Sequence, residues 1–173
     1  MIFDSRRLRS QQMPDENGKR KKREYADGLT VGPSPIDGQG CFATIFFLKD
    51  AKVAEYAGEK ITCQEALRRS SRQRKIRISM IDAHWSIDGS VGGNGTEYIN
   101  HSCEPNCGVI VIHGQIQIHA QREIAPGEEI TVDYLDASDF RSGECCCGSK
   151  FCRGGGKVTS KRRDVSEESG FAN

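Results

Sequence analysis

Three cysteines within residues 145–152 place the tightest chemical constraint on what this chain can fold into. Cys145, Cys147 and Cys152 form a C-x-C-x4-C array, and thiolates at this spacing can reach one tetrahedral metal ion. A structural zinc site is normally closed by four ligands, so a fourth must come from elsewhere, with Cys103 and Cys107 as candidates. The alternative interpretation is a reduced cysteine tail that binds no metal.

The remaining cysteines and the N-terminus bear on the environment of the protein. The 173-residue chain has 8 cysteines, which would also suit a secreted disulfide framework. However, the polar N-terminus lacks the apolar core of a signal peptide, and residues 145–147 are consecutive cysteines. The longest apolar stretch, residues 41–48, is shorter than the ~20 residues that cross a bilayer. We therefore expect a soluble, intracellular protein that does not enter a membrane.

The length of the chain favours one folded domain with loose ends. Residues 1–27 lack a periodic apolar pattern and include the basic run 19–23, which predicts a flexible basic arm. That run is either a solvated tail or a nuclear import signal or nucleic-acid patch. Residues 157–173 predict a second flexible tail, rich in charge and Ser. The formal net charge of +1 gives no global attraction to nucleic acid or membrane.

The region between the two ends predicts a fold made mainly of β-strands. Turn residues and Val/Ile enrichment predict strands over residues 41–47, 52–61, 76–81, 84–87, 109–113, 115–120 and 129–134. His113 and Gly114 predict a tight hairpin, and residues 125–127 predict another turn. Only residues 62–73 look helical, with Thr62 as N-cap and Glu65 at the capping-box spacing.

Two polar segments interrupt this pattern. Residues 98–107 read YINHSCEPNC, which is too long and too rich in amide, imidazole and hydroxyl groups for a simple turn. Residues 129–134 read EITVDY, which alone is a strand that ends in an aromatic residue. A lone His or Asn in the first segment is most often a hydrogen-bonded core residue. Each segment by itself is therefore weak evidence for a site.

Together, and in this order, the three segments resemble the SET-domain lysine methyltransferases over residues 28–156. The resemblance rests on G-x-G-x-F-A at 38–43, E-Y-x-G-E at 55–59, I-D-G at 87–89, G-N at 93–94, N-H-S-C-x-P-N at 100–106, D-Y at 133–134 and C-x-C-G-S-x-x-C at 145–152. It implies a mainly β SET fold with short helices and a pseudoknot over residues 28–137. A zinc-bound post-SET segment would follow over residues 138–156.

The resemblance also implies an activity, which is transfer of a methyl group from S-adenosyl-L-methionine to a lysine of a protein. The implied roles are catalysis for Tyr134 with Tyr56 lining the lysine channel, cofactor binding for Gly38, Gly40, Asn100, His101 and Phe151, and zinc binding for Cys103, Cys145, Cys147 and Cys152. His101 would act largely through its backbone. Phe151 is alternatively a plug for the small metal core, and Cys107 and Cys146 are then bystanders.

The chemistry that this family performs needs a neutral amine aligned with the methyl group and the leaving sulfur. The usual lysine pKa of about 10.4 opposes this. A narrow apolar channel and the adjacent sulfonium both disfavour the ammonium, and they lower that pKa without a strong base.

Several features depart from the family or leave the function open. Glu97 stands where many members have Arg, and Val132 stands where many have an aromatic that helps set how many methyl groups are added. No cysteine-rich region precedes the SET segment. Residues 68–77 carry six positive charges and no acid, which indicates either a substrate-steering surface or a solvated helix face.

Two other classes of function stay open, a non-catalytic SET-like binding module and a small zinc protein that binds nucleic acid. The expected partners are a lysine-containing protein, histone or other, and nucleic acid at the basic segments. We expect a monomer that is nuclear or chromatin-associated in a eukaryote and otherwise cytoplasmic.

Overall fold

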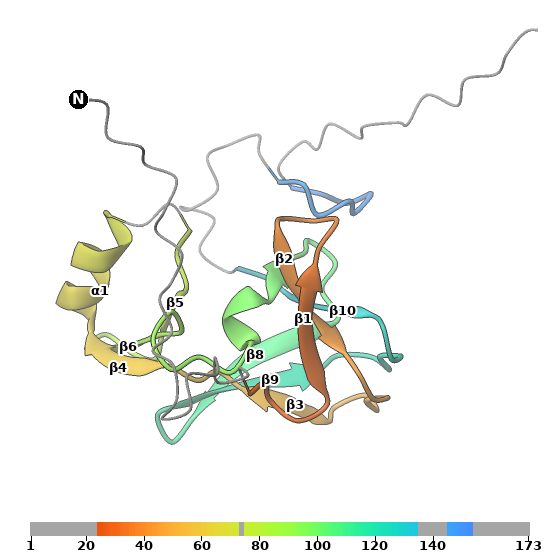
Figure 1. The fold of residues 1–173 in the computed structure, drawn as a ribbon, viewed down its shortest axis with the longest axis horizontal. Coiled ribbons are helices and arrows are strands. Elements are labelled where there is room, and N and C mark those ends of the chain that lie inside the picture. The colour runs from red at the N-terminus through yellow and green to blue at the C-terminus, as the bar shows by residue number, and fades with distance from the viewer. Residues whose placement is uncertain (1–23, 73–74, 135–144, 154–173) are drawn as a thin grey trace, which may run out of the picture.

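The computed structural model describes residues 24–72, 75–134 and 145–153, which fold mainly into short β-strands (Figure 1). Ten strands, one α-helix and one 3-10 helix are found within these residues. This confirms the predicted fold class. No helix within the described residues is long and apolar enough to span a membrane.

The four-stranded sheet brings together the segments that carry the sequence motifs. Its order is β1-β2-β10-β7, with bounds Leu29–Pro33, Gln39–Ala43, Glu129–Val132 and Asn100–His101. Strands β10 and β7 run parallel, with Thr131 opposite Asn100 and Val132 opposite His101. The N-H-S-C and D-Y motifs therefore lie side by side although they are far apart in sequence. We call this pair of strands, with residues 102–106 and 133–134, the crossing.

Two three-stranded sheets complete the β-structure. One has the order β3-β9-β8, with bounds Lys52–Glu55, Gln115–Ala120 and Cys107–Ile112. The other has the order β4-β6-β5, with bounds Glu59–Thr62, Trp85–Asp88 and Ile78–Met80. Helix α1 (Cys63–Ser70) continues directly from β4, and the 3-10 helix η1 (Thr96–Tyr98) leads into β7.

The hydrophobic core lies between the four-stranded sheet and the β3-β9-β8 sheet. Its most deeply buried members include Cys41 on β2, Ile118 on β9, Ile124 after β9 and Ile130 on β10. Burial of such side chains is the main favourable term in folding, since apolar area leaves water. The crossing is therefore anchored on one side by the centre of the core.

The predicted helix and turns are largely confirmed. The α-helix begins after Thr62, whose Oγ1 accepts a hydrogen bond from the Glu65 backbone N at 3.2 Å. The helix ends at Ser70, three residues before the predicted end. His113 and Gly114 both have positive φ, 50° and 76°, which is the conformation of a tight two-residue hairpin loop. Gly127 also has positive φ, 85°, in the second predicted turn.

One predicted strand, residues 52–61, is instead two strands in different sheets. The break lies at Gly58, where a Cβ would come within 2.4 Å of the Asp88 backbone O. Strand β1 was missed by the sequence analysis because residues 29–33 contain a glycine and end in a proline. Both residues are depleted in strands, and a proline is tolerated at a strand end.

The predicted arm (1–27) and tail (157–173) lie mostly or wholly outside the described residues. Residues 24–27 are described, and among them Ala26 packs against the core. Its backbone N–H donates to the Asn94 carbonyl at 2.8 Å. The predicted post-SET segment, 138–156, is described over residues 145–153.

Candidate functional site

Asn100 occupies a buried polar cradle at the start of the crossing. Its Nδ2 lies 3.0 Å from Ser34 Oγ, 3.1 Å from the Gln39 carbonyl and 2.8 Å from Glu129 Oε1. Because an amide nitrogen carries two hydrogens, these acceptors fix its orientation. Asn100 was predicted from the sequence, whereas its partners Ser34 and Glu129 were not. A signal for Glu129 is present in the sequence, since this acid directly precedes the β-branched residues 130–132 of a predicted strand.

Gly40, predicted to border the cofactor, is required by this cradle. A Cβ at Gly40 would come within 2.3 Å of Glu129 Oε1 and 2.9 Å of Ser34 Cβ. At Gly38, φ is +54°, and a Cβ would lie 2.8 Å from Lys75 Nζ. Both glycines therefore allow close approach of other groups, because they lack a Cβ, and their role beside the cofactor stays a prediction. The approaching groups in the structure are side chains of this chain.

Tyr134 follows β10, and both of its ends are fixed. Its hydroxyl donates to the Ile99 carbonyl at 2.6 Å, and its backbone N–H donates to His101 Nδ1 at 3.1 Å. Although the side chain as a whole is 43% exposed, partial desolvation by the surrounding protein raises the pKa of Tyr134 to about 12, helped by the negative charges of Asp37 and Glu129. The phenol is therefore neutral and protonated at physiological pH.

Tyr56 follows β3, and its hydroxyl donates to the Arg77 carbonyl at 2.8 Å. Burial raises its pKa well above the usual value, and the nearby groups Glu97 and Tyr134 raise it further. The Tyr56 hydroxyl lies beside Glu97, since a Cβ at Gly89 would come within 2.9 Å of the hydroxyl oxygen and 2.5 Å of Glu97 Cβ. Glu97, which stands where many family members have Arg, is itself buried and accepts a hydrogen bond from the Gly95 backbone N–H at 2.8 Å.

Val132, where many family members have an aromatic residue, belongs to the core cluster and is 7% exposed. A larger side chain at this position would have to displace core neighbours.

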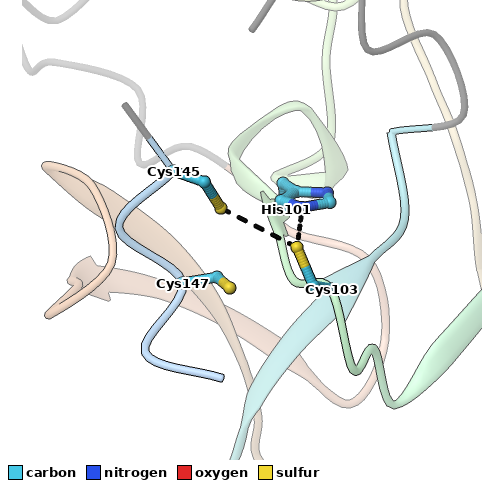
Figure 2. A group of neighbouring side chains, drawn as sticks. All are labelled: His101, Cys103, Cys145 and Cys147. Atoms are coloured by element: carbon cyan, nitrogen blue, oxygen red, sulfur yellow. Dashed lines mark hydrogen bonds between the residues drawn. The ribbon is translucent and has the colours of Figure 1, made fainter. Parts of the chain in front are cut away.

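Four side chains of the types that ligate metals gather where the C-terminal cysteine segment meets the crossing (Figure 2). The ligand atoms of His101, Cys103, Cys145 and Cys147 all lie within 4.8 Å of one another. Thiolate and imidazole are the ligands that structural zinc sites use, so these residues fit zinc. Cys107 is fully buried on β8 and lies outside this group, so of the two candidates only Cys103 joins the cluster.

Cys152 lies beside this group but is not one of the four. Its thiol donates to the Cys145 carbonyl at 3.7 Å. Burial raises the pKa of Cys145 to about 12, and contacts with the thiols of Cys152, Cys147 and Cys103 raise it further. Cys152 therefore touches the cluster through Cys145, while Cys146 is exposed.

Further contacts attach residues 145–153 to the crossing. The Ser149 hydroxyl donates to Glu104 Oε2 at 2.6 Å, and the Arg153 backbone N–H donates to Cys103 Sγ at 3.3 Å. The Arg153 guanidinium also pairs with Asp133. The Phe151 ring is 69% exposed and is not packed into the cysteine cluster, and both roles expected for it, beside the adenine or as a plug for the metal core, stay predictions.

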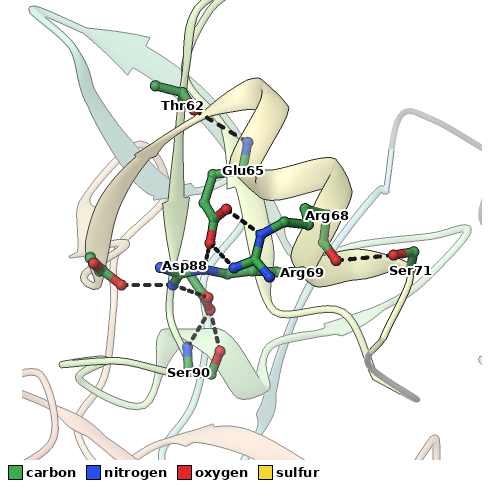
Figure 3. A network of polar contacts seen from close by, with 8 residues as sticks. Thr62, Glu65, Arg68, Arg69, Ser71, Asp88 and Ser90 are labelled. Atoms are coloured by element: carbon green, nitrogen blue, oxygen red, sulfur yellow. Dashed lines mark hydrogen bonds and ion pairs between the residues drawn. The ribbon is translucent and has the colours of Figure 1, made fainter.

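Three of the six positive charges of the 68–77 segment have an acid partner among the described residues. Arg68 pairs with Glu65 of the same helix, whereas Arg69 and Lys75 pair with acids from other segments. Figure 3 shows the contacts of Arg68 and Arg69. Arg69 contacts Glu59 at 2.7 Å and the buried Asp88 at 2.8 Å, which ties α1 to the β4-β6-β5 sheet. Lys75 contacts Asp37 at 2.8 Å, next to Gly38. The freely steering surface expected from the local absence of acids is therefore smaller than predicted, because folding supplies the acids.

Comparison with known proteins identifies the same family that the sequence motifs resemble. The SET domain family model matches residues 38–135, more than half of the chain. The chain is 39% identical over 140 residues to the histone-lysine N-methyltransferase trithorax of Drosophila virilis. It is 37% identical over 135 residues to the H3 lysine-4 specific histone-lysine N-methyltransferase of Schizosaccharomyces pombe. These alignments cover 76% and 73% of this chain but only 4% and 15% of the relatives.

Solved structures agree with this assignment. An active polycomb repressive complex 2 in the stimulated state matches with a TM-score of 0.59 and 26% identity, over 63% of this chain and 15% of that chain. A ctPRC2 structure bound to S-adenosylmethionine in an autoinhibited conformation matches with a TM-score of 0.57 and 26% identity, over 64% of this chain and 15% of that chain. The family model, the relatives and the crossing of the two motifs agree, and the chain belongs to the SET-domain family.

Proposed function

We propose that this chain transfers a methyl group from S-adenosyl-L-methionine to lysine side chains of a protein substrate. The observation that carries the proposal is the crossing. Its parallel strands bring the Tyr134 hydroxyl to the carbonyl of Ile99, the residue directly before the buried Asn100. Membership of the SET-domain family and the histone-lysine methyltransferase relatives support it. A histone tail is the first substrate to test.

In this proposal the cofactor supplies the methyl group as a sulfonium, and the protein residues orient and desolvate the reactants. Gly38, Gly40 and Asn100 would hold the cofactor together with the His101 backbone and the exposed Phe151 ring. The Tyr134 hydroxyl already donates its hydrogen to the Ile99 carbonyl, so the phenolic oxygen is left as an acceptor. The raised pKa of Tyr134 keeps that oxygen neutral, since a phenolate would hold the substrate as an ammonium.

The zinc site would fasten residues 145–153 over this region. The proposed ligands are Cys103, Cys145, Cys147 and Cys152, and the contacts of Ser149 and Arg153 with the crossing support the same placement. A closed four-ligand site is structural, so zinc would fold the segment and take no part in the chemistry.

The proposed setting is nuclear, since the relatives are named as histone-lysine methyltransferases. The solved neighbours lie in structures of polycomb repressive complex 2, so a multi-subunit assembly is the alternative to the monomer that we expected. Those cations of the basic segments that are not paired with acids would contact nucleic acid.

Two substitutions test the proposed roles. Tyr134→Phe keeps the ring and should leave folding and binding of labelled cofactor nearly unchanged. It should lower kcat by roughly 10²-fold or more, because a positioned polar group is lost from a water-poor transition state. Asn100→Ala should weaken cofactor binding first. Tyr25→Phe is the matched control, because it removes a phenol hydroxyl of similar exposure, 37% against 43% for Tyr134, outside the crossing.

The assay uses tritiated cofactor with histones and with a whole-cell extract, followed by mapping of the modified residue. Near wild-type methylation by Tyr134→Phe, together with normal cofactor binding by Asn100→Ala, would contradict the assigned roles. A wild-type chain that binds cofactor and methylates no protein would favour the alternative, a non-catalytic SET-like module.

A further inference from the structure

The side chain of His101 has two well-defined partners on opposite sides of its ring. The residue is 6% exposed and lies on β7. Its Nε2 is 3.2 Å from Cys103 Sγ, and its Nδ1 is 3.1 Å from the Tyr134 backbone N. Figure 2 shows the contact with Cys103. The ring therefore stands between the cysteine cluster and the residue to which catalysis is assigned.

The partner at Nδ1 fixes where the ring carries its hydrogen. A backbone N–H can only donate a hydrogen bond, so the Nδ1 that faces Tyr134 N must be an unprotonated acceptor. A ring with a bare Nδ1 is neutral and carries its hydrogen on Nε2. An Nε2 that holds a hydrogen has no lone pair for a metal, so it donates to Cys103 Sγ. Spacing alone groups Nε2 with the thiols within 4.8 Å, but the hydrogen excludes it as a ligand.

We propose that His101 is a positioning residue and not a zinc ligand, with Nε2–H donating to the metal-binding thiolate of Cys103 and Nδ1 holding the backbone N–H of Tyr134. The zinc cluster would thereby set the position of the tyrosine. The coupling to catalysis rests on the proposed function, whereas the hydrogen-bond assignment does not. The fourth ligand is then Cys152, whose thiol touches Cys145.

A second connection joins the same two segments. Arg153 pairs with Asp133 through its guanidinium, and its backbone N–H donates to Cys103 Sγ at 3.3 Å. Asp133 Oδ1 lies 3.5 Å from His101 Nδ1, where a lone carboxylate would favour a protonated ring. Because the Arg153 cation partly neutralises that carboxylate, the bare Nδ1 acceptor is compatible with its surroundings.

The tautomer can be measured on the unaltered protein. The full chain is prepared with isotopically labelled histidine rings and loaded first with zinc and then with NMR-active cadmium. We expect a protonated Nε2 and a bare Nδ1 in His101, and no scalar coupling between cadmium and either ring nitrogen. Coupling to Nε2, or a hydrogen on Nδ1, overturns the proposal.

Two substitutions separate the two contacts. In His101→Gln the side-chain amide reaches about as far as Nε2 and can still donate to Cys103, but it lacks an acceptor at the Nδ1 position. In His101→Asn the carbonyl oxygen replaces Nδ1, but the donor to Cys103 is lost. We expect His101→Asn to weaken zinc binding by about 10–100-fold, the usual cost of losing a partner of a metal ligand. His101→Gln should stay within about tenfold of wild type.

Exchange of the Tyr134 amide with solvent should show the reverse order, faster in His101→Gln than in His101→Asn. Cys152→Ser should weaken zinc binding more than either histidine variant. If both histidine variants lose zinc as strongly as Cys103→Ser, His101 is a ligand and the proposal is wrong. None of these measurements needs methyl transfer, so a chain with this tautomer and no methylation of protein overturns the proposed function alone.

Discussion

The crossing and the C-terminal cysteine segment, residues 145–153, lie against each other but are stabilised in different ways. In the crossing, Asn106 is 2% exposed and accepts a hydrogen bond from the Thr131 backbone N at 2.8 Å. Its Nδ2 donates to the Glu129 carbonyl, also at 2.8 Å. Ile130 beside it is fully buried in the core. Hydrogen bonds and apolar burial are present here together.

Residues 145–153 contain no helix or strand, and of their side chains Cys145 alone is buried. Their links to the crossing are thiol contacts and exposed polar pairs, and exposed pairs contribute little to stability. The difference indicates that the crossing folds through burial, whereas the cysteine segment needs a metal to stay in place.

Removal of zinc should have the largest effect on this contrast. Chelation should abolish methyl transfer and release residues 145–153, because zinc binding supplies most of the folding free energy of a segment without a core. The β-strands should persist, as circular dichroism and slow amide exchange in β9 and β10 would report. Loss of all folded structure on chelation would mean that the crossing also depends on the metal.

A cavity in the crossing should have the next largest effect. It should lower the stability of the β core and leave the cysteine segment's metal site unaffected. Ile130→Ala should lower the free energy of unfolding by about 2–5 kcal/mol, the usual cost of truncating a buried isoleucine. Denaturant titration of the zinc-free protein measures this without a contribution from metal binding. Cys147→Ser is the control and should change the free energy of unfolding of the zinc-free protein by less than about 0.5 kcal/mol. Equal losses in the two variants would contradict the comparison.

Thiol reactivity should distinguish the regions within one sample. Burial raises the pKa of both Cys41 and Cys107 to about 12, and both are fully buried in the core. Their alkylation should be slow with or without zinc, since the thiolate is the reactive form. Alkylation of Cys103, Cys145, Cys147 and Cys152 should accelerate by roughly tenfold or more when zinc is removed. Mass spectrometry of the labelled peptides gives each rate, and acceleration at Cys41 would show that the core opens as well.

The same contrast explains how far the sequence could predict the structure. Elements with local signals were predicted well, such as the helix after Thr62 and the hairpin at His113 and Gly114. The capping residue and the left-handed turn are set by neighbours in the chain. Strand β1 gave no such signal, because its place is decided by pairing with β2, as in Leu29 opposite Ala43.

The candidate site shows the same difference between residues with a local sequence signal and residues placed by long-range contacts. Motif residues such as Asn100 and Tyr134 could be assigned from a resemblance, but their partners could not. Ser34 and Glu129 reach Asn100 across 66 and 29 positions of the chain. The acids that pair with Arg69 and Lys75 also come from other segments. Long-range polar partners of this kind depend on the folded topology, which spacing in one sequence does not encode.

The smallest effect should come from a single exposed hydrogen bond that attaches the cysteine segment. The Ser149 hydroxyl donates to Glu104 Oε2, and it also accepts from the Phe151 backbone N at 3.0 Å. Ser149→Ala removes both bonds and Glu104→Ala removes the first alone, so a double-mutant cycle isolates the link between the segments. That link should contribute no more than about 0.5 kcal/mol to the free energy of unfolding of the zinc-free protein, because residues 145–153 are released without the metal.

With zinc bound, neither substitution should change amide exchange over residues 145–153, because the metal holds the segment whether or not the bond forms. Without zinc, exchange over these residues should be fast in both variants and in the wild type alike, because the segment is already released. A large effect in the zinc-bound protein would mean that surface polar contacts hold the segment. The division between a region stabilised by burial and a region held by metal would then be wrong.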